Sequence, residues 1–245
     1  MSESYNALSG KKWVVCGDSF TNGLEQNTLI PEGRYQGHRS VYPYLIANRN
    51  DMELVSCFEG GRTLAYPPEP GTFRNSLTAP DMPWNYQNIP ADADYITIYL
   101  GINDSHHAPH ASSGDGEDIT GKIPLGSLED ETIHSFGGAW NVVLWWLVRN
   151  RPRAHIGIIV SNGVETEDYR NMTIAAARKY GLPYLDLNGD ERCPVMGRST
   201  NGAILQSVRD YRTRTFAVDP PRNTHPNALA HEYESRFIEA WLRSI

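Results

Sequence analysis

The chain has 245 residues, of which 40% are hydrophobic and 21% charged, and its formal net charge is −7. This length suits one α/β domain with a buried sheet, and the composition is that of a folded, loop-rich protein rather than a disordered one. The negative charge gives no long-range attraction to phosphate backbones or anionic lipids, so we expect no nucleic-acid partner.

The cysteines and the hydropathy pattern narrow the class further. Cys16, Cys57 and Cys193 are too few and too scattered for a disulfide framework, and no CxxC pair suggests structural zinc. We predict buried free thiols at Cys16 and Cys57, which lie in apolar runs. No apolar stretch has the length of a signal peptide or a membrane span. We therefore expect a soluble protein, either cytoplasmic or secreted with its signal peptide absent from this sequence.

Short apolar runs rich in β-branched residues recur along the chain and predict strands buried on both faces. They are residues 12–16, 53–57, 95–100, 155–160 and 184–187. Helical periodicity is clearest at residues 139–149, 166–180 and 227–243. The alternation of strand and helix predicts a parallel sheet covered on both sides, and long surface loops are expected at 66–90 and 105–135. No repeat or linker interrupts the pattern, so we predict a single domain over residues 1–245.

The first three predicted strands each end in residues suited to acyl chemistry. The first runs straight into residues 17–20 (GDSF), which places Ser19 at the edge where open α/β sheets bind ligands. An isolated GDS tripeptide is more often a helix cap. However, residues 59–63 (EGGRT) follow the second strand with unobstructed glycine N–H groups, and Asn103 in residues 101–104 (GIND) follows the third. We expect these groups to converge on one point.

A histidine near the C-terminus completes the set. Residues 223–227 (NTHPN) place His225 just before the last predicted helix, on a loop able to reach the same edge. An imidazole titrates near neutral pH and suits general-base work on a serine hydroxyl. Most single histidines are surface or capping residues, and its position after the other three motifs is what distinguishes His225.

The order GDS, GGRT, GIND and HPN resembles the four sequence blocks of the SGNH/GDSL hydrolases, a family of serine esterases and lipase-like acylhydrolases. The resemblance implies a three-layer α/β/α sandwich of flavodoxin-like topology, with about five parallel strands in the order 2-1-3-4-5. It implies Ser19 as the nucleophile and His225 as the base. It also implies an oxyanion hole made by the Ser19 N–H, the Gly61 N–H and the Asn103 side chain.

The implied reaction is ester hydrolysis through an acyl-serine intermediate, with neither metal nor organic cofactor. Polar, aromatic-bearing loops without a long apolar lid favour a short acyl group, above all acetyl, on a small molecule or a glycan. Tyr66, Trp84 and Tyr86 are candidates to line the substrate cleft, and Arg62 either contacts a leaving group or lies on the surface. A lipase or lysophospholipase and a non-catalytic carbohydrate-binding relative remain as alternatives.

The chain departs from the family at the acidic residue. Family members usually carry an aspartate three residues before the histidine, where this chain has Arg222, and a guanidinium cannot accept the ring N–H. Asp219 is the nearest carboxylate, and the prolines that follow it could form a bend that returns it to His225. We assign Asp219 as the orienting acid, with a loop carbonyl or a plain Ser/His dyad as the alternatives.

Other polar groups near these motifs have structural interpretations. Asp18 and Asp104 are expected to accept hydrogen bonds from loop N–H groups rather than to form an acid pair or bind metal. His106, His107 and His110 have a spacing that could hold a divalent cation. We favour a solvated loop there, because no clear fourth ligand follows.

Overall fold

The computed structural model describes residues 5–23, 27–67, 75–106, 123–161, 167–187, 211–212, 214–220 and 223–245. It contains a five-stranded parallel sheet in the order β2-β1-β3-β4-β5, as predicted. The strands are β1 (Lys12–Gly17), β2 (Glu53–Phe58), β3 (Tyr95–Tyr99), β4 (His155–Val160) and β5 (Tyr184–Asp186). Each overlaps the apolar run from which it was predicted, because a strand covered on both faces needs apolar side chains at nearly every position.

The register of the central strands brings three loops to one place. Gly17 at the end of β1 pairs with Phe58 on β2 and with Tyr99 on β3. Because the three strands are parallel, their carboxyl ends are level. The segments that follow them therefore begin at the same edge of the sheet.

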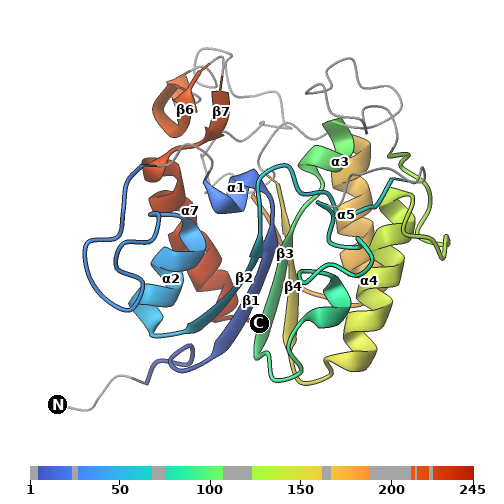
Figure 1. Cartoon of the computed structure of the whole chain (residues 1–245), viewed down its shortest axis with the longest axis horizontal. Helices are drawn as coiled ribbons and strands as arrows, with labels where there is room; N and C mark the ends of the chain where they lie inside the picture. Colours follow the sequence, from blue (N-terminus) through green and yellow to red (C-terminus); the bar gives the residue numbers. More distant parts are fainter. Residues whose placement is uncertain are drawn as a thin grey trace.

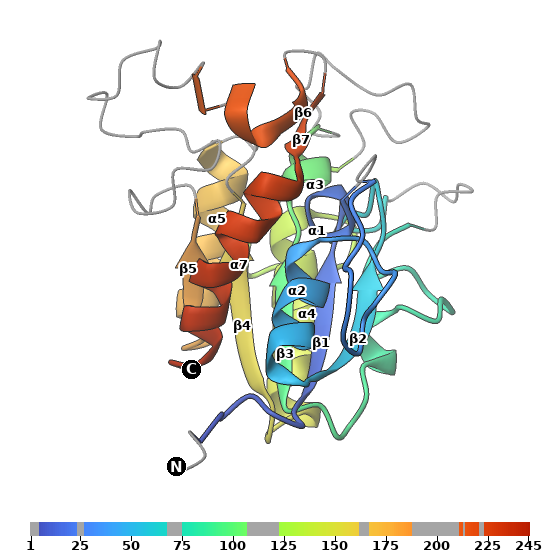
Figure 2. The ribbon, with the colours of Figure 1, turned by 90° about the vertical axis from the view of Figure 1, so that its left-hand side faces the viewer.

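Helices cover both faces of the sheet and form the outer layers of a sandwich. α2 (Tyr42–Asn50) and α7 (Ala228–Leu242) lie on one face, and α4 (Phe136–Asn150) and α5 (Glu167–Lys179) lie on the other (Figures 1 and 2). α4, α5 and α7 match the predicted helices. α2 was not predicted, because its short sequence, YPYLIANRN, mixes polar and aromatic residues without a long periodic run.

The core consists of one apolar cluster on each side of the sheet. Trp13 and Tyr42 are fully buried in the cluster under α2 and α7. Trp140 is fully buried in the cluster under α4 and α5. Trp145, one turn further along α4, is 52% exposed.

Several short elements lie in the connections between the strands and the long helices. α1 (Ser19–Asn22) follows β1, α3 (Ile102–His106) follows β3, and the 3₁₀-helix η1 (Tyr86–Asn88) lies in the predicted 66–90 loop. The antiparallel pair β6 (Ala217–Asp219) and β7 (Asn223–Pro226) lies above α1 (Figure 1). Among the helices that the structure describes, none is long and apolar enough to cross a membrane. The single-domain extent of 1–245 stays a prediction.

Candidate active site

The serine lies at the start of α1, directly after the first strand. Asp18 is the N-cap of α1, and its carboxylate accepts a hydrogen bond from the Phe20 N–H at 2.9 Å. Ser19 is 3% exposed. Gly17 permits this tight strand-to-helix turn, because a Cβ at that position would lie 2.2 Å from the Thr21 hydroxyl oxygen. The GDS motif is therefore both a helix cap and the mount of the candidate nucleophile.

The structure brings His225 to this serine from the other end of the chain. The Nε2 atom of His225, on β7, lies 2.8 Å from the Ser19 Oγ. The imidazole also packs against the Phe20 ring, with 5.2 Å between the ring centres. A hydroxyl and an imidazole at this distance are in position for proton transfer.

Asn223 fixes the protonation geometry of this imidazole. Its Oδ1 lies 2.8 Å from His225 Nδ1 and also accepts a hydrogen bond from the His225 backbone N–H at 3.1 Å. A backbone N–H can only donate, so the atom facing the ring is an acceptor, and Nδ1 carries the proton. Nε2 is then the basic nitrogen that faces Ser19, as a general base requires.

Asn223 is part of the NTHPN motif, but no catalytic role was predicted for it from the sequence. Its role could have been predicted from its spacing, because an asparagine side chain readily accepts a hydrogen bond from the N–H two residues later, which here is that of His225. Such a turn sets the amide oxygen beside the His225 ring. Asp219, the acid predicted for this role, is exposed on β6 and lies across the ribbon in register with Asn223. Its catalytic role stays a prediction, and Arg222 lies outside the described residues.

The predicted oxyanion groups stand on the neighbouring loops. Asn103 is 8% exposed on α3, and its Nδ2 donates one hydrogen bond to the Arg62 carbonyl oxygen at 2.9 Å. The side-chain amide carries a second N–H on the same nitrogen. Gly61 lies in the turn after β2 with a φ of 73°, a left-handed conformation that glycine adopts without strain. The bond to Arg62 thus joins the two loops that carry the predicted donors.

Comparison with known proteins gave structural matches only. No family model matches the chain, and neither does any curated protein sequence. A protein from Lactobacillus plantarum has 24% sequence identity and a TM-score of 0.61, over 96% of this chain and 98% of that one. A Bacteroides ovatus protein named as a GDSL-like lipase has 14% identity and a TM-score of 0.58, over 97% of this chain and 100% of that one.

A third structure is a family two carbohydrate esterase from Clostridium thermocellum in complex with cellohexaose. It has 15% identity and a TM-score of 0.51, and the match covers 99% of this chain and 66% of that chain. The three matches cover 96%, 97% and 99% of this chain, so the similarity extends over the whole fold. The chain has the SGNH hydrolase fold. Its predicted three-layer architecture is confirmed.

In this SGNH fold, two buried aspartates brace the loops around Ser19. The Asp104 carboxylate accepts hydrogen bonds from the Leu64 and Ala65 N–H groups, each at 2.9 Å at its shortest. Burial raises the pKa of Asp104 to about 7 and that of Asp18 to about 8. The interpretation of both as loop-fixing residues is confirmed, because their oxygens accept from backbone donors.

Arg62 and the aromatic residues predicted to line the cleft pack against other side chains of the protein. Arg62 is 3% exposed, so a surface role for it is wrong. Its Nε donates to Asn75 Oδ1 at 3.1 Å, and its guanidinium lies 4.9 Å from the centre of the Trp84 ring. Tyr86 is buried against Trp146. The guanidinium is buried because the amide and the indole replace its water contacts.

The remaining candidates are Tyr66, predicted to line the cleft, and the three histidines whose spacing could hold a metal. Tyr66 is half-buried beside His134, whose Nδ1 lies 2.9 Å from the Tyr66 carbonyl oxygen. His106 ends α3, whereas His107 and His110 lie outside the described residues. No group of three metal-ligating side chains is found within the part of the chain that the structure describes.

Proposed function

We propose that this protein is a serine ester hydrolase that acts through an acyl-enzyme on Ser19. The observation that carries the proposal is the 2.8 Å approach of His225 Nε2 to the Ser19 Oγ, with Nδ1 held by Asn223. A serine hydroxyl is a poor nucleophile until a neighbouring base takes its proton, and this geometry supplies such a base. The SGNH fold supports the same interpretation.

In the first half-reaction, the Ser19 Oγ attacks the ester carbonyl carbon while its proton moves to His225 Nε2. The carbonyl π electrons move onto oxygen and give a tetrahedral oxyanion. When this intermediate collapses, the bond to the alcohol oxygen breaks and His225 returns the proton to the leaving alcohol. In the second half-reaction, water attacks the acyl-serine with the same proton transfers and releases the acid.

The oxyanion needs hydrogen-bond donors that are already in place. We assign them to the Ser19 N–H, the Gly61 N–H and the second N–H of the Asn103 amide. Asn103 is supported in this role by its burial and by its bond to the Arg62 carbonyl, which holds the amide plane. A fixed donor stabilises developing charge without a reorganisation cost.

For the substrate, we propose a short acyl ester, above all acetyl, on a carbohydrate. The polar and aromatic loops of the sequence support this choice, and so does the similarity in fold to a carbohydrate esterase. A lipase or lysophospholipase is the second candidate, favoured by the fold of the GDSL-like lipase from Bacteroides ovatus.

A fluorophosphonate probe tests the nucleophile. We expect covalent labelling of Ser19, located by peptide mass spectrometry, and none at that peptide in Ser19→Ala. Circular dichroism of the variant controls for its fold. Glycan binding without any labelling of Ser19 would overturn the proposal in favour of a carbohydrate-binding relative.

Two assays test the substrate class. Acetate release from a panel of acetylated glycans, with Ser19→Ala as control, is expected to identify the acceptor. Against p-nitrophenyl esters, we expect the acetate to be hydrolysed faster than the octanoate. A strong preference for octanoate would reject the short acyl group and support the lipase.

A further inference from the structure

Two thiols face one another across the first two strands, a few residues before the candidate site. Cys16 on β1 pairs directly with Cys57 on β2. Both are free and buried. Adjacent strands lie about 4.8 Å apart, and a disulfide spans Cα separations of about 4.4–6.8 Å. The register therefore suits a covalent bond between these side chains.

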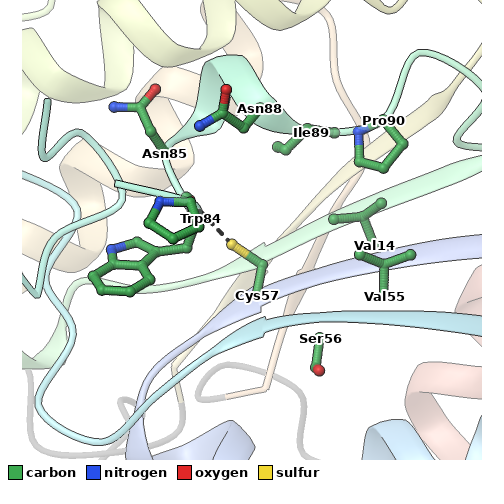
Figure 3. Close-up of a pocket in the computed structure, with 10 residues that line it drawn as sticks. Val14, Val55, Ser56, Cys57, Trp84, Asn85, Asn88, Ile89 and Pro90 are labelled. Atoms are coloured by element: carbon green, nitrogen blue, oxygen red, sulfur yellow. Dashed lines mark hydrogen bonds between the residues drawn. The ribbon is translucent and has the colours of Figure 1, made fainter. Parts of the chain in front are cut away.

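Only one of the two thiols meets a cavity. Cys57 is 7% exposed and, with Trp84 and Ile89, lines a cavity of about 210 Å³, whereas Cys16 is fully buried. Figure 3 shows the Cys57 sulfur pointing from β2 toward Trp84, and the Cys57 thiol donates a hydrogen bond to the Trp84 carbonyl oxygen at 3.2 Å. Neither Ser19 nor His225 is among the described residues that line this cavity. A small reagent that enters it reaches Cys57 first.

The neighbouring groups shift the pKa values of the two thiols in opposite directions. The adjacent Cys16 thiol and the nearby Arg62 guanidinium lower the pKa of Cys57. Arg62 Nη1 lies 3.9 Å from the Cys57 sulfur. The adjacent Cys57 thiol and burial raise the pKa of Cys16. Cys57 meets the cavity and has the lower pKa, so we assign it as the nucleophile, which reacts as the thiolate once its proton is lost, and Cys16 as its partner.

We propose that Cys57 and Cys16 form a modification site for small hydroperoxides. The Cys57 thiolate attacks one oxygen of the peroxide, the O–O bond breaks, and Cys57 becomes a sulfenic acid while hydroxide or alkoxide leaves and takes up a proton. The Cys16 sulfur then attacks the sulfenic sulfur, a disulfide forms, and water leaves with the Cys16 proton. Two electrons pass from the thiols to the peroxide, which is reduced to water or an alcohol.

The site is connected to the proposed catalytic centre through two short links. Cys16 directly precedes Gly17, from which the chain enters the Ser19 turn. In the turn after β2, Arg62 contacts the Cys57 sulfur, and its carbonyl oxygen accepts the hydrogen bond that holds Asn103. We therefore expect the disulfide to lower esterase activity, an effect that rests on the proposed function, whereas the thiol chemistry does not.

Peptide mapping of the full chain after hydrogen peroxide treatment tests the modification. A Cys193→Ser background removes the third cysteine, which lies outside the described residues. We expect loss of two thiols and a peptide cross-link between Cys16 and Cys57 that dithiothreitol reverses. The unmutated chain should give the same cross-link, which guards against a folding defect in the variant. An intermolecular dimer, or sulfonic acid at Cys57 with Cys16 still a thiol, would overturn the proposal.

Single substitutions separate the two roles. In Cys16→Ser, dimedone should trap a sulfenic acid at Cys57. In Cys57→Ser, Cys16 should remain a thiol at the same peroxide dose. Trapping at Cys16 in Cys57→Ser would reverse the assignment and refute it.

An activity measurement then tests the link to the site. We expect at least a tenfold fall in p-nitrophenyl acetate hydrolysis on oxidation, restored by dithiothreitol, and no such fall in Cys57→Ser. A cross-link without a change in activity would reject the link while supporting the modification site. If the reduced protein has no esterase activity, the proposed function fails, and the cross-link still decides the thiol chemistry.

Discussion

At the scale of single residues, the group facing the imidazole decides how the proposed base works. The Asn223 oxygen, 2.8 Å from His225 Nδ1, fixes the ring tautomer but carries no negative charge. An imidazolium forms whenever Ser19 gives up its proton, and a carboxylate stabilises that charge better than an amide. Replacing Asn223 by aspartate and Asp219 by asparagine therefore tests which of the two residues orients His225.

For Asn223→Asp, we expect the acidic limb of the rate–pH profile to move to higher pH, because the new carboxylate favours the charged imidazole. The readout is kcat/KM for p-nitrophenyl acetate across the pH range. Asn223→Ala is expected to lower kcat/KM by about tenfold to a hundredfold, in line with losing a group that orients a base.

Asp219→Asn is the matched variant. If Asp219 is the orienting acid, its replacement lowers activity by orders of magnitude, and a loss below about tenfold points to another acceptor or to a dyad. The geometry of Asn223 favours the smaller loss. A profile unmoved by Asn223→Asp, together with a large loss in Asp219→Asn, would show that Asn223 is not the acceptor.

Asn103 gives a second prediction at the residue scale. We expect Asn103→Ala to lower kcat/KM by roughly 10²–10³, since one oxyanion donor is worth about 2.7–4 kcal/mol of barrier. Fluorophosphonate labelling of Ser19 and a cooperative thermal transition should persist. A loss below tenfold in a folded variant contradicts the assignment.

At the scale of elements, the start of α7 holds the histidine strand in place. The Asn227 side chain caps α7 by accepting from the Ala230 N–H at 3.0 Å. Its Nδ2 donates to the carbonyl oxygens of Thr215 at 2.9 Å and Ala217 at 3.1 Å. One residue thus anchors the helix, β6 and β7, and so sets where His225 can stand.

We expect Asn227→Ala to cost about 1–2 kcal/mol of unfolding free energy, as lost caps do, and to lower kcat/KM as well. Urea unfolding measures the first effect and steady-state kinetics the second. Ser135→Ala is the matched control, because Ser135 caps α4 by accepting from the Gly138 N–H. It should lose similar stability with little change in kcat/KM, and equal activity losses in both variants would refute the anchoring role.

At the scale of the whole molecule, burying two carboxyl groups beneath the active-site loops links stability to pH. In the unfolded chain both titrate near the ordinary value of 3.8, whereas in the folded protein the pKa is about 8 for Asp18 and about 7 for Asp104. The folded state therefore binds more protons between these values. The stability that these two groups contribute is fully present below about pH 4 and declines as pH rises toward 8.

We expect each group to contribute a slope of about −1.4 kcal/mol per pH unit within that window. Asp104→Asn should remove one such contribution below about pH 7, as measured by urea unfolding at a series of pH values. Asp92→Asn is the exposed control: Lys12 lowers the pKa of Asp92, so no slope change is expected in the same window. An unchanged slope in Asp104→Asn would contradict the burial argument.

The sequence by itself predicted the strands, three of the helices and a parallel sheet, and the resemblance to the SGNH/GDSL hydrolases supplied the strand order. These depend on local pattern, because a strand buried on both faces must be apolar throughout and a helix must repeat its apolar face. The positions of Ser19, Gly61 and Asn103 were predictable for the same reason, since each lies in the segment that follows a strand, whereas their catalytic roles stay predictions. His225 required the order of four motifs.

The tertiary structure alone decided which groups meet. Asn223 rather than a carboxylate came to face His225, Arg62 proved to be buried, and Cys16 came to pair with Cys57. Each of these contacts joins residues through a turn, a strand register or a loop packing that no local pattern specifies. The chemistry of a side chain is written in the sequence, but its partner is set by the free energy of packing the whole chain.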